Sequence, residues 1–200
     1  MKKIAVLLSG RGSNFMSIKK AVDEGFINGE IAVVISNKSD AKGLEFAREN
    51  GLDAVFVNPK DFDGRESYDG ELVRILKEKE VDLVCLAGFM RIISPVFVEA
   101  FRNRIINIHP SLLPSFKGLD AQSQALEYGV RFAGCTVHFV DEEMDHGAII
   151  LQSVVPVEQD DTDETLSARI LREEHRIYPE AVKLFCADKI KVEGRKVLIT

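Results

Sequence analysis

The sequence predicts an α/β protein with a doubly wound, mostly parallel sheet. In the first half of the chain, short apolar runs alternate with longer amphipathic patterns, which indicates repeated strand–helix–strand units. These runs are apolar at successive positions rather than at every second one, as is typical of strands covered on both faces. Helices should therefore pack against both sides of the sheet.

Each element of this half has local signals for its ends. Gly51 stops the second helical pattern and Gly88 ends the fourth strand, because glycine tolerates the backbone of a helix end or a turn. Pro95 opens a short helix, since its fixed φ suits the first helical position. The expected strands are 4–8, 31–36, 54–57, 83–87 and 105–109, and the expected helices are 15–24, 41–50, 67–80 and 95–101.

The second half changes character. A short helix at 122–128 is closed by Gly129, and two strands, 135–140 and 148–157, are joined by an acidic loop. A long helix follows at about 163–187, and a terminal hairpin at 190–199 turns at Glu193 and Gly194. No linker or repeat separates the halves, so we expect one domain over residues 1–200, with halves 1–104 and 105–200 and a mixed C-terminal part.

Composition limits the possible functions. No apolar run approaches the ~20 residues of a membrane span, and the run after Lys3 is too short for a signal peptide, so a cytoplasmic location is expected. The net charge of −6 argues against broad nucleic-acid binding, although a helix N-terminus can still hold an anionic small molecule. Cys85, Cys135 and Cys186 are odd in number and far apart, so buried, reduced thiols are expected.

The most informative stretch is the end of the fifth strand. Side chains on a strand alternate faces, so Asn107 and His109 point the same way, and Pro110 keeps the backbone before it extended. Histidine can take and give a proton near neutral pH, and an asparagine amide can stabilise an oxyanion. Ligands of open α/β sheets bind at this end of the strands. Taken alone, the stretch is slightly more typical of a strand end with one polar turn, whose histidine bonds to backbone.

A glycine-rich loop joins the first strand to the first helix. Gly10 and Gly12 allow a ligand to approach the backbone, and the helix N-terminus offers free N–H groups. Ser13 or Asn14 could also cap this helix. The loop suggests phosphate binding, although it lacks the third glycine of a dinucleotide fingerprint and the lysine of a P-loop.

The long helix carries a carboxylate within its apolar stripe. Glu174 recurs at helical spacing with Ile170 and Tyr178, and an unpaired buried carboxylate is costly. Its partner could be a ligand, or one of the nearby arginines Arg169, Arg172 and Arg176. Pro179 should kink the helix. His175 points about 100° away from Glu174, which suggests a structural role with a hydrogen bond near that kink.

The acidic loop at 141–147 contains four carboxylates and a histidine. A solvated hairpin loop explains Asp141, Glu142 and Glu143, and the spacing of the acids does not favour a metal site. Asp145 is different, because a carboxylate facing His109 would favour the imidazolium form and orient the ring. His138, on the strand before this loop, alternates with Thr136 and is expected to be a packed residue beside the site.

Residues 107–114 resemble the signature of formyltransferases that use 10-formyltetrahydrofolate. Other motifs, in the same order and spacing along nearly the whole chain, are similar to those of phosphoribosylglycinamide formyltransferases of purine synthesis, with their Rossmann-like fold. These motifs are Ser9-Gly10-Arg11-Gly12-Ser13-Asn14, Ser36-Asn37-Lys38, Leu86-Ala87-Gly88-Phe89-Met90-Arg91-Ile92, Val137-His138-Phe139-Val140, Asp145-x-Gly147 and Glu174-His175-x-Ile177-Tyr178-Pro179.

The resemblance implies a role for each matching position. Asn107, His109 and Asp145 would be the catalytic trio, which also contacts folate through Asn107 and Asp145. The amino half would bind phosphate, and the carboxyl half would hold folate and carry out catalysis. Phosphoribosylglycinamide would contact Gly12, Ser13, Asn14 and Glu174, and the folate would contact Arg65, Met90, Arg91, Ile92, Ile93, Asp141, Glu142, Glu143, Met144 and Asp145.

The implied reaction needs 10-formyltetrahydrofolate as co-substrate and no metal. The expected partners are these small molecules, not nucleic acid or membrane, and the chain could be a monomer or a homodimer. Two positions depart from the family pattern: Asp120 replaces a common histidine, and His146 replaces a smaller or uncharged residue. The alternatives are methionyl-tRNA formyltransferase, formyltetrahydrofolate deformylase and a non-catalytic nucleotide-binding module.

Overall fold

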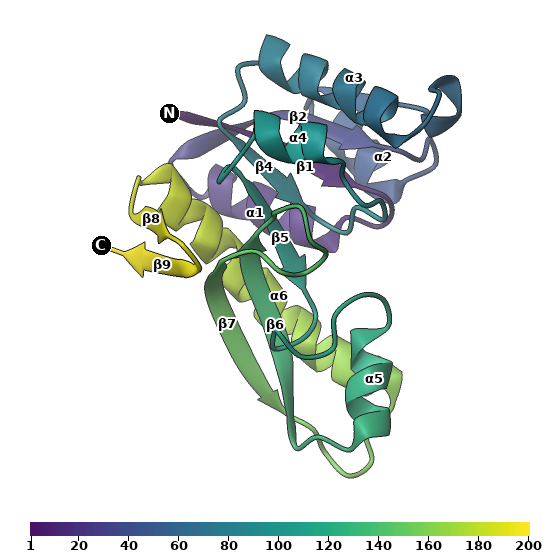
Figure 1. The fold of residues 1–200 in the computed structure, drawn as a ribbon, viewed down its shortest axis with the longest axis vertical. Helices are drawn as coiled ribbons and strands as arrows, with labels where there is room; N and C mark the ends of the chain where they lie inside the picture. Colours follow the sequence, from purple (N-terminus) through teal and green to yellow (C-terminus); the bar gives the residue numbers. More distant parts are fainter.

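The computed structural model describes residues 1–200, and a seven-stranded sheet runs through it (Figure 1). The strand order is β3-β2-β1-β4-β5-β6-β7, in which the first five strands pair in parallel and the last two antiparallel. The prediction of a doubly wound, mostly parallel sheet is therefore confirmed. The strands are β1 (Lys2–Leu8), β2 (Gly29–Ser36), β3 (Ala54–Phe56), β4 (Leu83–Leu86), β5 (Ile105–His109), β6 (Phe132–Phe139) and β7 (Ile149–Pro156).

Helices cover both faces of the sheet, as the apolar strands require. Alternate residues of β1 divide between two cores: Ile4 and Val6 pack with one set of helices, and Ala5 and Leu7 with the other. The first face is covered by α1 (Ser13–Asp23), α2 (Lys42–Glu49), α5 (Ala121–Tyr128) and α6 (Asp163–Cys186), and the second by α3 (Arg65–Glu78) and α4 (Pro95–Ala100).

The longest helix, α6, crosses the first face behind β5 and β6 (Figure 1). It begins at a capping box in which Thr162 and Thr165 exchange hydrogen bonds. It runs as one helix through Pro179. Tyr178, fully buried, donates from its hydroxyl toward the carbonyl oxygens of Leu86 and Ile106, both 3.0 Å away. This residue therefore ties α6 to the last residue of β4 and the second residue of β5, next to Asn107.

A separate hairpin ends the chain, as predicted. Strands β8 (Ile190–Glu193) and β9 (Lys196–Ile199) pair only with each other, and Gly194 adopts the positive φ of 60° that their tight turn requires. A 3-10 helix, η1 (Pro59–Asp61), lies between β3 and α3. The structure contains no helix that is long and apolar enough to cross a membrane.

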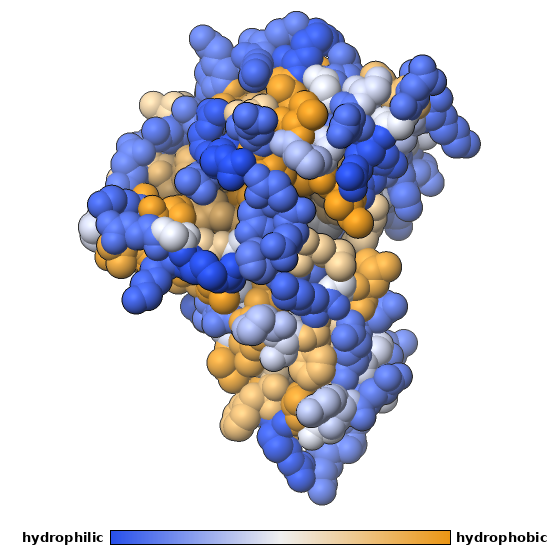
Figure 2. All heavy atoms as spheres, viewed as in Figure 1, coloured by the Kyte–Doolittle hydropathy of each residue, from blue (hydrophilic) through white to orange (hydrophobic).

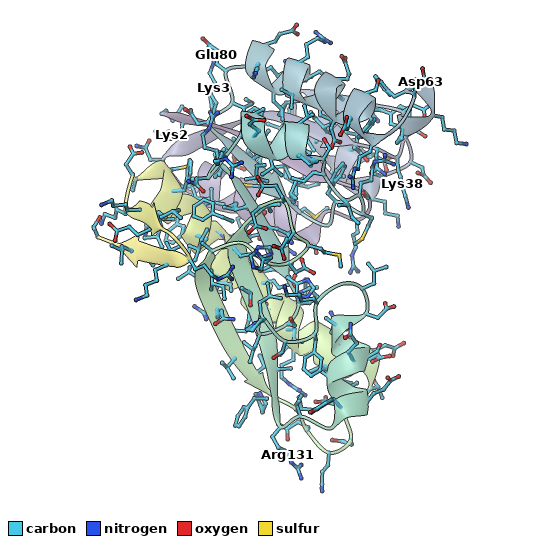
Figure 3. The ribbon with its side chains drawn as sticks, viewed as in Figure 1. Lys2, Lys3, Lys38, Asp63, Glu80 and Arg131 are labelled. Carbon is cyan, nitrogen blue, oxygen red and sulfur yellow. The ribbon has the colours of Figure 1, made fainter.

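The three cysteines are free and buried, as expected. Exposed ion pairs lie around the amino ends of the strands, where Lys3 Nζ is 2.7 Å from Glu80 Oε2 (Figure 3). Hydrophobic side chains gather on the lower part of the molecule, over β6 and β7 (Figure 2), where Phe132 and Val154 are more than half exposed.

Candidate active site

The active-site candidates come together where β5 and β6 pair. The antiparallel register places Asn107 opposite His138, and His109 opposite Thr136. His109, Thr136 and His138 are buried. Four polar side chains therefore lie next to one another at the carboxyl end of β5, on a scaffold of two hydrogen-bonded strands.

His109 and Asp145 meet, although 36 residues separate them in the sequence. His109 Nδ1 is 3.5 Å from Asp145 Oδ2, and the two side chains are only 6% and 11% exposed. The other ring nitrogen, Nε2, is 2.9 Å from the carbonyl oxygen of Phe116. A carbonyl only accepts, so Nε2 carries a proton. The histidine therefore bonds to backbone, as the simpler interpretation of the strand end has it, and it also faces the carboxylate.

Asp145 is held in place by the loop after β5. The backbone N–H of Gly118 donates to Asp145 Oδ2 over 2.8 Å, and Asp145 itself adopts a positive φ of 50°. Non-glycine residues rarely adopt this conformation, and they do so where surrounding contacts fix it. One short segment, 116–118, therefore contacts both the histidine and the carboxylate.

His138 orients the amide of Asn107. Its Nδ1 is 2.8 Å from the Phe139 carbonyl oxygen and so carries the proton. Nε2 is then the acceptor, 3.3 Å from Asn107 Nδ2. Burial lowers the pKa of His138, which favours this neutral form. The second N–H of the Asn107 amide is left available to a ligand. The expectation of a packed residue beside the site fits His138.

The arrangement is suited to proton transfer beside a developing negative charge. The amide N–H of Asn107 and the imidazole ring of His109, which lies next to the Asp145 carboxylate, are both available on one side of the sheet. Donors fixed in this way stabilise an oxyanion without reorganising during the reaction. No group of three or more His, Cys, Asp and Glu side chains is arranged to hold a metal ion.

The loop between β1 and α1 has the geometry of an anion site, with one correction. Gly12 is the N-cap of α1, at φ 74°, and no side chain caps the helix. The expectation that Ser13 or Asn14 caps it is wrong, because both residues already belong to the first turn. A Cβ on Gly12 would lie 3.0 Å from the Cα of Gly43, so the loop packs closely on α2. The first N–H groups of α1 are left free of intrahelical partners.

Glu174 lies under this loop and bonds to Asn14. Asn14 Nδ2 donates to Glu174 Oε2 over 2.7 Å, and both side chains are buried. Burial raises the pKa of Glu174. The alternative of an arginine partner is wrong: two of the three candidates pair elsewhere, Arg169 with Asp161 and Arg176 with Glu173, and none pairs with Glu174.

Charges surround the same loop. A cavity of about 370 Å³ next to it is lined by Arg11, Lys38 and Lys42, and none of the three forms an ion pair. His175 has a buried Nε2 atom without a hydrogen-bond partner, which contradicts the expectation that it bonds near Pro179. Burial and the nearby Arg11 lower the pKa of His175. The surroundings of the loop are therefore cationic.

The segment after β4 forms a second wall. Met90 and Ile92 are exposed, whereas Ile93 is buried in the core under α3 and α4, so only the backbone of Ile93 can reach a ligand. Arg91 stacks over the ring of Tyr68 at 4.6 Å. Arg65, the first residue of α3, is exposed and forms no ion pair. Both arginines are thus free to meet an anion.

The acidic loop is more ordered than a solvated loop would be. Asp141 Oδ2 is 2.8 Å from His146 Nδ1, and Glu142 pairs with Arg102 over 2.6 Å. Glu143 and Met144 are exposed. Only Asp145 points toward β5.

The sequence analysis did not predict several contacts of the site. Thr136 donates to the Ser111 carbonyl over 2.7 Å and accepts from Leu113 N–H over 3.1 Å, which fixes the loop after His109. Thr136 is a polar residue two positions before His138 on a buried strand, and this pattern could have marked it as part of the site. The contacts of Phe116 and Gly118 use backbone atoms, which no residue pattern indicates.

Comparisons with known proteins agree with this geometry. The formyl transferase family model matches residues 2–182. The chain is 45% identical to phosphoribosylglycinamide formyltransferase of Escherichia coli, over 94% of this chain and 89% of that protein. It is 48% identical to a trifunctional purine biosynthetic protein of Drosophila melanogaster, of which it spans only 14%.

Solved structures give the same result. The crystal structure of glycinamide ribonucleotide transformylase 1 from Symbiobacterium toebii superposes with a TM-score of 0.98 at 54% identity, covering 100% of this chain and 94% of that chain. Phosphoribosylglycinamide formyltransferase from Anaplasma phagocytophilum gives a TM-score of 0.92 at 47% identity, with the same coverage. The chain therefore belongs to the formyl transferase family, among the phosphoribosylglycinamide formyltransferases.

Proposed function

We propose that this protein transfers the formyl group of 10-formyltetrahydrofolate to the amine of phosphoribosylglycinamide in purine biosynthesis. Family membership supports the reaction type. The observation that carries the proposal is the cluster of His109, Asp145 and Asn107 at the end of β5. A non-catalytic nucleotide-binding module would not need such a cluster.

In this reaction the free amine attacks the formyl carbon and forms a tetrahedral intermediate with negative charge on oxygen. The positive charge of protonated His109 and the amide N–H of Asn107 stabilise that oxygen. Asp145 lies beside the ring of His109 and positions a water, which carries the proton of the amine to the leaving folate nitrogen. Collapse of the intermediate breaks the bond to this nitrogen. Acid–base catalysis of this kind contributes about 10²–10⁴ in rate.

The binding roles follow the walls of the site. Gly12, Ser13 and Asn14 hold the phosphate at the N-terminus of α1, where the free N–H groups and the helix dipole favour an anion. Glu174 binds the glycinamide end, which gives its buried carboxylate a second partner. The folate lies between the Met90–Ile93 segment and the 141–145 loop, with Arg65 at its anionic tail. Within one domain, the half 1–104 thus supplies the phosphate loop and the half 105–200 the catalytic residues, while the folate is held by segments of both halves.

The donor set around the reacting groups consists of one imidazole, one amide and one carboxylate, and the proposed steps use no metal. We place the enzyme in the cytoplasm, acting as a monomer or homodimer.

An absorbance assay with 10-formyl-dideazafolate tests the proposal, with each substrate omitted in turn. Deformylation that requires phosphoribosylglycinamide supports it. Deformylation without the glycinamide would instead indicate a hydrolase. An absence of deformylation when both substrates are present would contradict the assigned acceptor.

Two substitutions test the residue roles. His109→Ala and Asp145→Asn should each lower kcat by about 10²-fold or more while circular dichroism stays unchanged. Asp53→Asn, an exposed carboxylate outside the site, is the matched control. Near-normal turnover in Asp145→Asn would refute the role of this carboxylate.

A further inference from the structure

The turn of the C-terminal hairpin reaches the loop that carries Asp145. Arg195 Nη2 donates to the carbonyl oxygen of His146 over 2.7 Å, and Nη1 lies 2.9 Å from His146 Nε2. On its other side, His146 Nδ1 is 2.8 Å from Asp141 Oδ2. The three side chains form a chain of contacts that links segments 49 residues apart.

This geometry fixes the orientation of the histidine. Arg195 Nη1 lies near both ring nitrogens, 2.9 Å from Nε2 and 3.4 Å from Nδ1. The Asp141 carboxylate lies on the Nδ1 side. The ring of His146 is therefore held from both sides. Asp141 also accepts from the backbone N–H of Glu143 over 3.0 Å, so the same side chain closes the loop on itself.

The loop held in this way forms part of the site. The loop begins at Asp141, after β6, and continues through Glu142, which pairs with Arg102. It then reaches Asp145, which adopts a positive φ. Arg195 acts on His146, the neighbour of Asp145. The hairpin lies beyond residue 182, where the match to the family model ends, so the contact joins His146, inside the matched range, to Arg195, outside it.

We propose that Arg195 is a positioning residue: through His146 it fixes the 141–147 loop in the conformation that places Asp145 and the folate-facing backbone. The expected effect of Arg195 on kinetics rests on the proposed function, whereas its expected effect on the 141–147 loop does not. The contacts of Arg195 are to the ring and carbonyl oxygen of His146, so it acts through the loop.

Hydrogen–deuterium exchange of the free protein tests the structural part without any activity. Arg195→Ala should increase exchange of the amides of residues 141–147, whereas Lys196→Ala should not. Lys196 is the matched control, since its side chain lies on the same hairpin and makes no hydrogen bond or ion pair. Equal exchange of this loop in wild type and Arg195→Ala would overturn the proposal, whether or not the protein proves to be a transferase.

Kinetics test the functional part. Arg195→Ala should raise the KM for the formyl-folate about three- to tenfold, the size expected for losing one or two exposed hydrogen bonds. The KM for phosphoribosylglycinamide should stay within about twofold, because Glu174 and the phosphate loop lie on other elements. Arg195→Lys should raise the KM for the formyl-folate less than Arg195→Ala does, since an ammonium can still donate to the His146 carbonyl.

A double-mutant cycle separates positioning from a general loss of stability. Because Arg195 acts through the ring as well as the carbonyl of His146, the effects of His146→Ala and Arg195→Ala on folate KM should be less than additive. Strict additivity, or a proportional rise in both KM values, would contradict the proposed route.

Discussion

Replacing Glu174 by glutamine should make the protein more stable and less active. The carboxylate is 7% exposed, accepts one hydrogen bond, from Asn14, and forms no ion pair. A glutamine of the same shape keeps an oxygen for the Asn14 amide and removes the buried charge. The structure thus offers a substitution in which stability and function move in opposite directions.

The pH dependence follows from the direction of the pKa shift. Burial raises the pKa of Glu174 above its ordinary value of 4.5, so the folded state binds this proton more tightly than the unfolded state does. The ionised carboxylate therefore lowers stability as pH rises above 4.5 and through the folded pKa. Relieving one such charge is worth about 1–2 kcal/mol, or about 2–8 °C in Tm for a domain of this size.

The assay is thermal unfolding of wild type and Glu174→Gln between pH 4 and pH 8. The two Tm values should nearly coincide at pH 4 and separate as pH rises, with the variant higher. A variant that is less stable at pH 7.5, or a difference that does not depend on pH, would refute the reasoning.

The same variant tests the proposed binding role. Losing a charge-assisted hydrogen bond costs about 1.5–3 kcal/mol, so the KM for phosphoribosylglycinamide should rise about ten- to hundredfold. The KM for the folate should change little. An unchanged glycinamide KM would remove Glu174 from the substrate site.

Two further predictions concern the core. Tyr178→Phe removes the hydroxyl that bonds to Leu86 and Ile106 and should cost about 1–2 kcal/mol in urea unfolding; an unchanged midpoint would contradict this. The thiols should react slowly with an aromatic disulfide reagent at pH 7.5, because burial raises the pKa of Cys135 to about 12 and of Cys186 to about 11 and the thiolate is the reactive form. Three thiols should react at once in denaturant, and fast labelling of the native protein would show an exposed cysteine.

The fold was predictable because strand and helix signals are local. Continuous apolar runs marked every strand of the parallel part, and the ends differ for identifiable reasons. β3 stops at Phe56 instead of residue 57, because its neighbour β2 ends at Ser36, its pairing partner. α3 begins at Arg65 instead of residue 67, because Gly64 adopts a φ of 113° at the N-cap and Glu66 favours the first turn.

The site was only partly predictable. The period of a strand places Asn107 beside His109, and this needs no tertiary information. The contact between Asp145 and His109 followed from resemblance alone, because spacing within one loop does not show what the loop faces. The bond between Asn14 and Glu174 joins residues 160 positions apart, on helices whose packing no single-sequence pattern gives. Contacts through the backbone of Phe116 and Gly118 are hidden for the same reason.

The antiparallel pairing of β5 with β6 sets a limit on chain length. Asn107 meets His138, and His109 meets Thr136, only in one register. Because successive residues of a strand face opposite sides, adding or deleting one residue in β6 would turn both polar side chains into the core and bring Cys135 and Val137 to the site. Strands separated by helices can absorb such changes in their surface loops. Within β6, evolution can therefore substitute one residue for another, but it cannot insert or delete a residue.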